Sequence, residues 1–100
     1  MTTLVMKLDA SDYSLEDGRM DENDALVIRQ KIINEMNEGT LEFVLLVEKN
    51  PRIDKSALLV LAGVWKLLFL QGGRLQIVGV EQETRQFIEE MGLSPFLLET

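Results

Sequence analysis

Apolar residues recur at three- and four-residue steps in three stretches of the chain. One face of an α-helix repeats every 3.6 residues, so this spacing predicts amphipathic helices. The predicted helices cover residues 21–37, 55–71 and 82–91. A glycine follows each of them, and glycine is common at a helix C-terminus because it adopts left-handed backbone without strain: Gly39, Gly72 and Gly92.

Short apolar runs outside these stretches predict β-strands. The predicted strands cover residues 4–8, 12–16, 41–47 and 75–78. The first two are separated by a turn cluster at residues 9–11, so we expect them to form an edge hairpin. The run from Phe43 to Val47 is apolar without alternation, which predicts a strand that is buried on both faces.

The order of the predicted elements is ββαβαβα, which is typical of an α/β fold. Helices that alternate with strands imply parallel strand pairs and right-handed crossovers. We therefore expect a mixed β-sheet with the three helices on one face, within a single domain spanning residues 1–100. Asp54 is expected to be the N-cap of the helix over 55–71, with its carboxylate accepting from amides in the first turn. The core is expected to contain Phe43, Leu45, Leu58, Leu61, Ile77 and Phe87.

The helix predicted over 55–71 is apolar on nearly every side, and Lys66 is its only charged residue after Lys55. The spacing assigns four residues to the core, namely Leu58, Leu61, Trp65 and Leu68. It leaves four other apolar residues on outward positions, namely Leu59, Val64, Leu67 and Phe69. Outward apolar residues favour an interface with a second copy or with another protein, and the alternative is scattered apolar exposure, which is common. A homodimer through residues 55–71 is therefore one expectation.

The composition excludes several kinds of chemistry. The chain has neither Cys nor His, which rules out disulfides, thiolate metal sites and imidazole acid–base catalysis. Carboxylates that could pair occur at Asp12, Glu16, Asp21 and Asp54, but no apolar pocket-forming pattern surrounds them. We therefore expect neither an enzyme nor a bound cofactor.

The formal net charge of −7 opposes contact with phosphate backbones and with anionic membranes, so we expect no nucleic-acid partner and no direct membrane insertion. The N-terminal residues lack a signal pattern, and the longest apolar run, 57–65, is too short to span a bilayer. We expect a cytoplasmic protein. The acidic stretch between residues 9 and 24 lacks calcium-loop spacing, which favours a solvated acidic rim in which Arg19 is the one base.

Five short motifs together resemble the STAS domain, the family of anti-sigma factor antagonists. Gly18-Arg-Met-Asp21 resembles the family's Gly-x-Leu-Asp, and residues 43–47 resemble its central strand. Residues 53–58, Ile-Asp-Lys-Ser-Ala-Leu, are similar to its Asp-Ser-Ser-Gly-Leu signature. Residues 72–79 and 87–93 resemble its return strand and its closing helix. The resemblance covers nearly the whole chain.

The resemblance implies a bacterial partner-switching phosphoprotein in transcription regulation. Its partner would be an anti-sigma factor that is also a serine kinase and that uses its own ATP. Ser56 matches the serine that this kinase phosphorylates, while Lys55 and Ala57 depart from the signature. Lys55 could pair with Asp54, pair with a phosphate or weaken kinase recognition. The implied partner-binding residues are Asp21, Asp54, Lys55, Ser56, Ala57 and Leu59. The alternative is a constitutive accessory subunit or scaffold, for example of a bacterial lipid-transport ABC complex or a signalling assembly, without phosphorylation.

Overall fold

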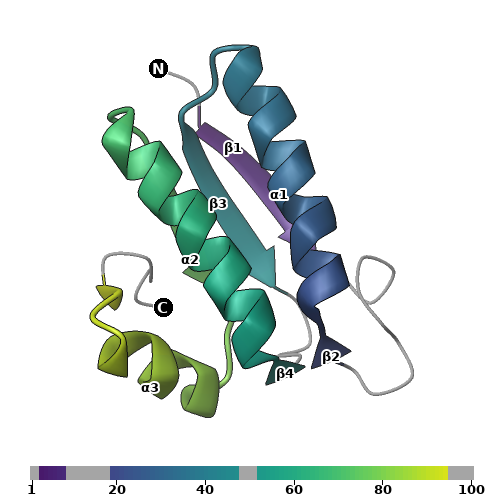
Figure 1. Ribbon diagram of the computed structural model, residues 1–100, viewed down its shortest axis with the longest axis vertical. Helices are drawn as coiled ribbons and strands as arrows, with labels where there is room; N and C mark the ends of the chain where they lie inside the picture. Colours follow the sequence, from purple (N-terminus) through teal and green to yellow (C-terminus); the bar gives the residue numbers. More distant parts are fainter. Residues whose placement is uncertain (1–2, 9–18, 48–51, 95–100) are drawn as a thin grey trace.

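The computed structural model describes residues 3–8, 19–47 and 52–94. Their elements are, in order, β1 (Thr3–Leu8), β2 (Arg19–Met20), α1 (Glu22–Asn37), β3 (Glu42–Val47), β4 (Arg52–Ile53), α2 (Lys55–Leu70), β5 (Arg74–Val78) and α3 (Gln82–Glu90) (Figure 1). The three predicted helices and the strands over 4–8, 41–47 and 75–78 are confirmed within one or two residues. The strand expected at 12–16, and with it the edge hairpin, lies outside the described residues.

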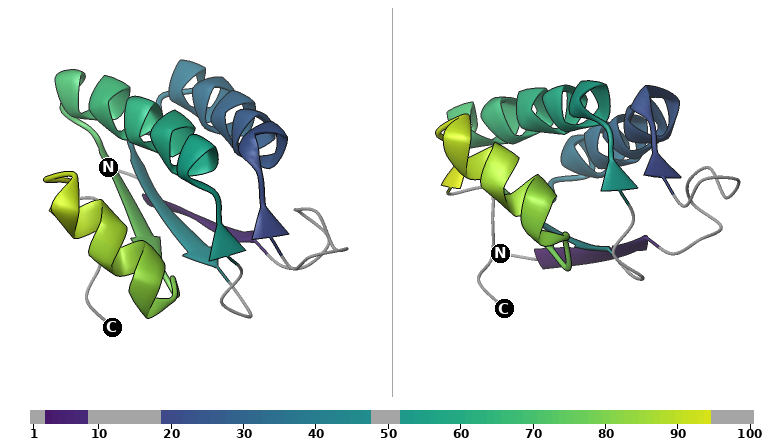
Figure 2. Two further views of the ribbon diagram at one scale, coloured as in Figure 1. Left: turned by 60° about the horizontal axis from the view of Figure 1, so that its bottom comes forward. Right: turned by 90° about the horizontal axis from the view of Figure 1, so that it is seen from below.

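The main sheet has the order β1-β3-β5, and both of its strand pairs are parallel. The register aligns Leu4 with Phe43 and Leu45 with Ile77, so their side chains point to the same face. Helices α1 and α2 cover that face, while α3 lies beside the edge formed by β5 (Figure 2). The α/β fold with helices mainly on one face is confirmed, but α3 does not join the layer of the other two helices.

The core lies between the sheet and the layer formed by α1 and α2. Five of the six predicted core residues are buried, namely Phe43, Leu45, Leu58, Leu61 and Ile77. The sixth, Phe87, is only half-buried because α3 lies at the edge of the sheet. The expectation that β3 is buried on both faces is also wrong, because buried and half-buried residues alternate along it.

The outward face of α2 differs from the prediction at two positions. Val64 is buried, while Trp65, assigned to the core stripe, is half-buried and stacks on Phe69 with ring centroids 5.6 Å apart. The cause is that α2 contacts α1 on one side and β5 below, so its buried arc is turned toward α1. Spacing along one helix identifies an apolar stripe but cannot identify the neighbours that cover it.

Gly73 joins α2 to β5 where the backbone comes very close to the residue before β3. The amide of Arg74 donates to the carbonyl of Leu41 at 2.8 Å. A Cβ on residue 73 would overlap that same carbonyl, so no larger residue fits without moving the strand. The preceding Gly72 has φ +79°, which supplies the left-handed turn that ends α2.

Candidate functional site

A second, two-stranded sheet holds the first residues of α1 and α2 side by side. Strands β2 and β4 pair in parallel, with Arg19 opposite Arg52 and Met20 opposite Ile53. Met20 and Ile53 are both buried, and the amide of Asp54 donates to the carbonyl of Met20 at 3.0 Å. Figure 1 shows both helices starting from this small sheet at one end of the molecule. The two aspartates of the family-like motifs, Asp21 and Asp54, are therefore brought to one end of the fold.

Asp21 is the N-cap of α1. Its Oδ1 accepts from the backbone amide of Asp24 at 3.0 Å, while Asp24 Oδ2 accepts from the Asp21 amide at 2.9 Å, which completes a capping box. These bonds favour the ionised carboxyl, so the pKa of Asp21 is lowered, chiefly by the Asp24 amide and to a smaller extent by nearby Arg19. The Asp21 carboxylate thus caps the first turn of α1.

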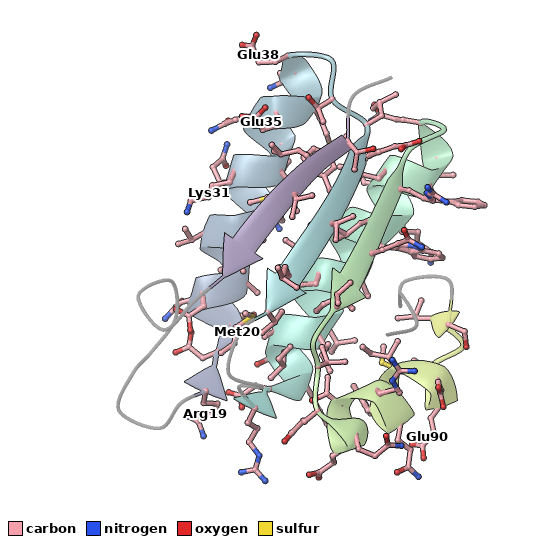
Figure 3. All side chains as sticks on the ribbon, turned by 180° about the vertical axis from the view of Figure 1, so that it is seen from behind. Arg19, Met20, Lys31, Glu35, Glu38 and Glu90 are labelled. Carbon is pink, nitrogen blue, oxygen red and sulfur yellow. The ribbon has the colours of Figure 1, made fainter. Side chains whose placement is uncertain are left out.

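Asp54 occupies the N-cap position of α2, as predicted, but its side chain does not cap the helix. Its Oδ1 lies 3.4 Å from Nε of Arg19 on β2. The expectation that the carboxylate accepts from first-turn amides is therefore wrong. The reason is a contact between distant segments, because β2 places the guanidinium of Arg19 at the N-terminus of α2 and the Asp54 carboxylate points to that charge. Figure 3 shows Arg19 at this end of the molecule, well away from Glu35 and Glu38 at the far end of α1.

Lys55 extends from α2 toward α3. Its Nζ lies 5.2 Å from the centroid of the Phe87 ring, within the range of a cation–π contact. The two residues contribute to the lining of a cavity of about 240 Å³ between the start of α2 and α3, which also includes Arg52, Leu58 and Thr84. Of the three roles considered for Lys55, pairing with Asp54 is not what the structure shows.

Ser56 is exposed in the first turn of α2. Val60, Gly63 and Leu67 follow it at steps of four, seven and eleven residues, which share one side of a helix. These three residues line a groove of about 330 Å³ between α2 and α1, together with Arg29 and Ile33 of α1. By this spacing Ser56 lies on the side of α2 that leads into the groove, while the ammonium group of Lys55 contacts Phe87 of α3.

The remaining two predicted contact residues differ in accessibility. Leu59 is 58% exposed and lines the same groove as Gly63. Ala57 is fully buried, so its side chain cannot touch a partner, and we remove it from the contact surface. The sequence reasoning missed Arg19 as a neighbour of Asp54 and Phe87 as a neighbour of Lys55. The one available signal was that Arg19 is the single base in an acidic stretch.

Within residues 3–8, 19–47 and 52–94, no group of three acidic side chains could hold a metal ion. Most of the acidic stretch considered for calcium lies outside these residues. No helix in the described part of the chain is both long and apolar enough to cross a bilayer.

Comparison with known proteins gives one clear result. The STAS domain model matches residues 16–100. No curated protein and no solved structure matched the chain. The matched range includes the small sheet, all three helices and the Asp54–Ser56 segment, and only β1 among the described elements precedes it. The chain therefore belongs to the STAS domain family.

Proposed function

We propose that this STAS domain is a protein-interaction switch of the anti-sigma factor antagonist type, controlled by phosphorylation of Ser56. STAS domains generally act by binding other proteins and not as enzymes. The observation that carries the proposal is the position of Ser56. It is exposed in the first turn of α2, two residues after the Asp54 that matches the family signature. Its hydroxyl is therefore accessible to a kinase.

The contact surface is the end of the molecule at which α1 and α2 begin. It consists of Asp21, Asp54, Lys55, Ser56 and Leu59, which are the N-cap residues of α1 and α2 and three residues of α2, and the β2–β4 pair holds the two helix starts together. In the unphosphorylated state this surface binds an anti-sigma factor that is also a serine kinase. The bound partner then no longer holds its sigma factor.

The covalent step is an ordinary phosphoryl transfer. The Ser56 oxygen attacks the γ-phosphorus of ATP held by the kinase, a new O–P bond forms, and the bond to the leaving ADP breaks. The hydroxyl proton passes to a base of the kinase. The product adds about −1.5 to −2 charges at pH 7 to a docked surface, where desolvation and repulsion oppose rebinding. A switch follows without a large change in the fold.

The test is phosphorylation by serine kinases that bind the protein, with ATP and mapping of the modified residue by mass spectrometry. We expect phosphate on Ser56 and none in Ser56→Ala. Ser94→Ala is the matched control, because Ser94 is also exposed but lies beyond α3, and it should be modified like the wild type. Phosphate on another residue, or none with a kinase proven active on a second substrate, would remove the antagonist function.

One observation favours a second candidate, a constitutive STAS accessory subunit or scaffold that is not phosphorylated. Four apolar residues on α2 are between 39% and 79% exposed, namely Leu59, Leu67, Phe69 and Leu70. Such a surface fits lasting contact with a partner subunit or with a second copy. The neighbouring genes discriminate between the candidates, because a switch accompanies kinase and sigma-factor genes and an accessory subunit accompanies transporter genes.

A further inference from the structure

Gly63, in the middle of α2, is a glycine that the fold of this chain does not require. It is exposed, and apart from its own turn of α2 a Cβ on it would meet nothing in the described part of the chain within 4 Å. Glycine inside a helix is less stable than alanine because it loses more backbone freedom on folding. Gly73 is different, since a Cβ there would overlap the carbonyl of Leu41. The missing side chain at Gly63 therefore leaves room for something outside the chain.

Two grooves meet at Gly63. The groove of about 330 Å³ shared with α1 includes Val64, and a second groove of about 280 Å³ includes Ala62 together with Met91 and Leu93, which follow α3. Gly63 lines both grooves. An α-helix turns about 100° per residue, so Ala62 and Val64 lie to either side of Gly63. Figures 1 and 2 show α1 on one side of α2 and α3 on the other. The two grooves are thus joined across α2 at a position that has no side chain.

The charge of these grooves differs from that of the whole chain, which has a formal net charge of −7. Arg29 lines the groove shared with α1, Lys66 lines the second groove, and both residues are exposed. Among the described residues, no carboxylate lines either groove. Apolar side chains form most of the remaining surface, and two of them, Leu59 and Leu67, are 58% and 39% exposed. A complementary ligand therefore has an apolar centre and a negative charge toward each end.

We propose that the two grooves bind an α-helix of another protein, which crosses α2 over Gly63 and carries acidic residues on both sides of an apolar centre. Side chains of one helix pack into the grooves of another, and a residue without a side chain at the crossing lets the two backbones approach closely. The apolar residues of the bound helix fill the grooves, and its acidic residues meet Arg29 and Lys66. This site shares only Leu59 with the contact surface proposed above, and it does not depend on phosphorylation of Ser56.

The α2 helix of a second copy is not the complementary helix. It contains no acidic residue. Two α2 helices that cross at Gly63 would bring Lys66 of both copies to one interface without a carboxylate from either helix, and like charges oppose such a contact. Phe69 and Leu70 line neither groove, so self-association through the C-terminal end of α2 is a separate matter. Charge therefore favours a different protein as the occupant of the grooves.

The experiment selects binders of the full chain from a library of helical peptides about five turns long. The library varies the central positions among Ala, Leu, Ile and Phe, and the flanking positions among Glu, Gln and Lys. We expect Glu to be enriched over Lys on both flanks by about threefold or more. Recovery of no helical peptide, or of peptides with basic flanks, would overturn the proposal.

Variants then locate the bound peptide on the protein. Gly63→Leu should weaken binding of a selected peptide about tenfold or more, because the new side chain fills the connection between the grooves. Gln86→Leu is the matched control, because it adds the same side chain at an exposed position of α3 that lines neither groove, and it should bind like the wild type. Arg29→Gln and Lys66→Gln should each reduce the preference for Glu on one flank. Equal effects of Gly63→Leu and Gln86→Leu contradict the crossing at Gly63.

Gly63→Ala separates a binding role from a structural one. Alanine stabilises a helix, so this variant should raise the melting temperature by about 2–8 °C and still bind the peptide more weakly. A lower melting temperature would show that the fold itself needs the glycine. If substitutions at Gly63 change only the sedimentation of the protein alone, the grooves belong to a second copy and the proposal is wrong. No kinase or ATP takes part, so these results are independent of the test of Ser56.

Discussion

The ammonium nitrogen of Lys55 lies 5.2 Å from the centre of the Phe87 ring, so the first residue of α2 contacts the middle of α3. Helix α3 lies at the edge of the sheet, and only Thr84 and Ile88 on it are buried. The Lys55–Phe87 contact is thus one of the few that hold α3 against α2.

This contact predicts a small and specific loss of stability. Lys55→Met keeps the length of the side chain but removes its charge, and should lower the free energy of unfolding by about 0.5–1 kcal/mol. Lys66→Met is the control, because Lys66 is exposed on the same helix and should cost less. Urea unfolding measures both, and a double-mutant cycle with Phe87→Leu should give a favourable coupling. No coupling would mean that the contact contributes nothing.

The Ser56→Asp variant should separate stability from binding. A carboxylate in the first turn of α2 interacts favourably with the helix dipole by about 0.3–1 kcal/mol, so the melting temperature should stay the same or rise slightly. Binding to the anti-sigma partner, measured by calorimetry, should weaken about tenfold or more, because the added charge must be desolvated or repelled. Ser56→Ala should bind like the wild type. If Ser56→Asp binds the partner as tightly as the wild type does, the proposed phosphorylation switch is contradicted.

Two leucines on α2 provide a matched test of the packing. Leu61 is fully buried, so Leu61→Ala should lower the free energy of unfolding by about 2–5 kcal/mol. Leu59 is 58% exposed, and Leu59→Ala should change it by about 0.5 kcal/mol or less. Chemical denaturation measures both values. Similar losses for the two variants would show that the orientation of α2 is wrong.

The capping box of α1 predicts a dependence of stability on acid. The pKa of Asp21 is lowered by the Asp24 amide, so the folded state holds the ionised form more strongly than the unfolded state does. This contribution is present above the unfolded pKa, near 4, and is lost as the pH falls through the lower folded pKa. Asp21→Asn still accepts a hydrogen bond but does not ionise. The wild type should therefore lose stability relative to Asp21→Asn below about pH 4. The difference between their unfolding free energies should stay constant above about pH 6.

The exposed apolar residues of α2 predict a dimer in which this helix forms the interface. Phe69 and Leu70 are 64% and 79% exposed, so Phe69→Lys should convert a dimer into a monomer with little change in melting temperature. Val27→Lys is the control, because Val27 is 55% exposed but lies on α1. Sedimentation over a range of concentrations gives the answer. A wild-type protein that is monomeric throughout rejects self-association and assigns this surface to another partner.

The sequence by itself determined the elements and most of the core. Helix and strand boundaries depend on local spacing, capping residues and glycine, so Asp21, Asp54 and Gly72 marked them within one or two residues. Leu58, Leu61 and Ile77 were identified because apolar periodicity reports burial in a helix or strand with one covered face, and Phe43 and Leu45 because they lie in a continuous apolar run. The phosphorylation candidate, Ser56, also followed from a local motif.

Only the tertiary structure decided which residues became neighbours. Val64 is buried and Trp65 is half-buried because α1 covers one side of α2, which no spacing within α2 encodes. Asp54 turns from its own helix to Arg19 because β2, more than thirty residues earlier in the chain, pairs with β4. Lys55 reaches Phe87 because α3 ends up at the edge of the sheet. Contacts between distant segments depend on how whole elements pack, whereas the elements themselves depend on nearby residues. For that reason the sequence could name the residues of a candidate site, but it could not name the side chains that contact them.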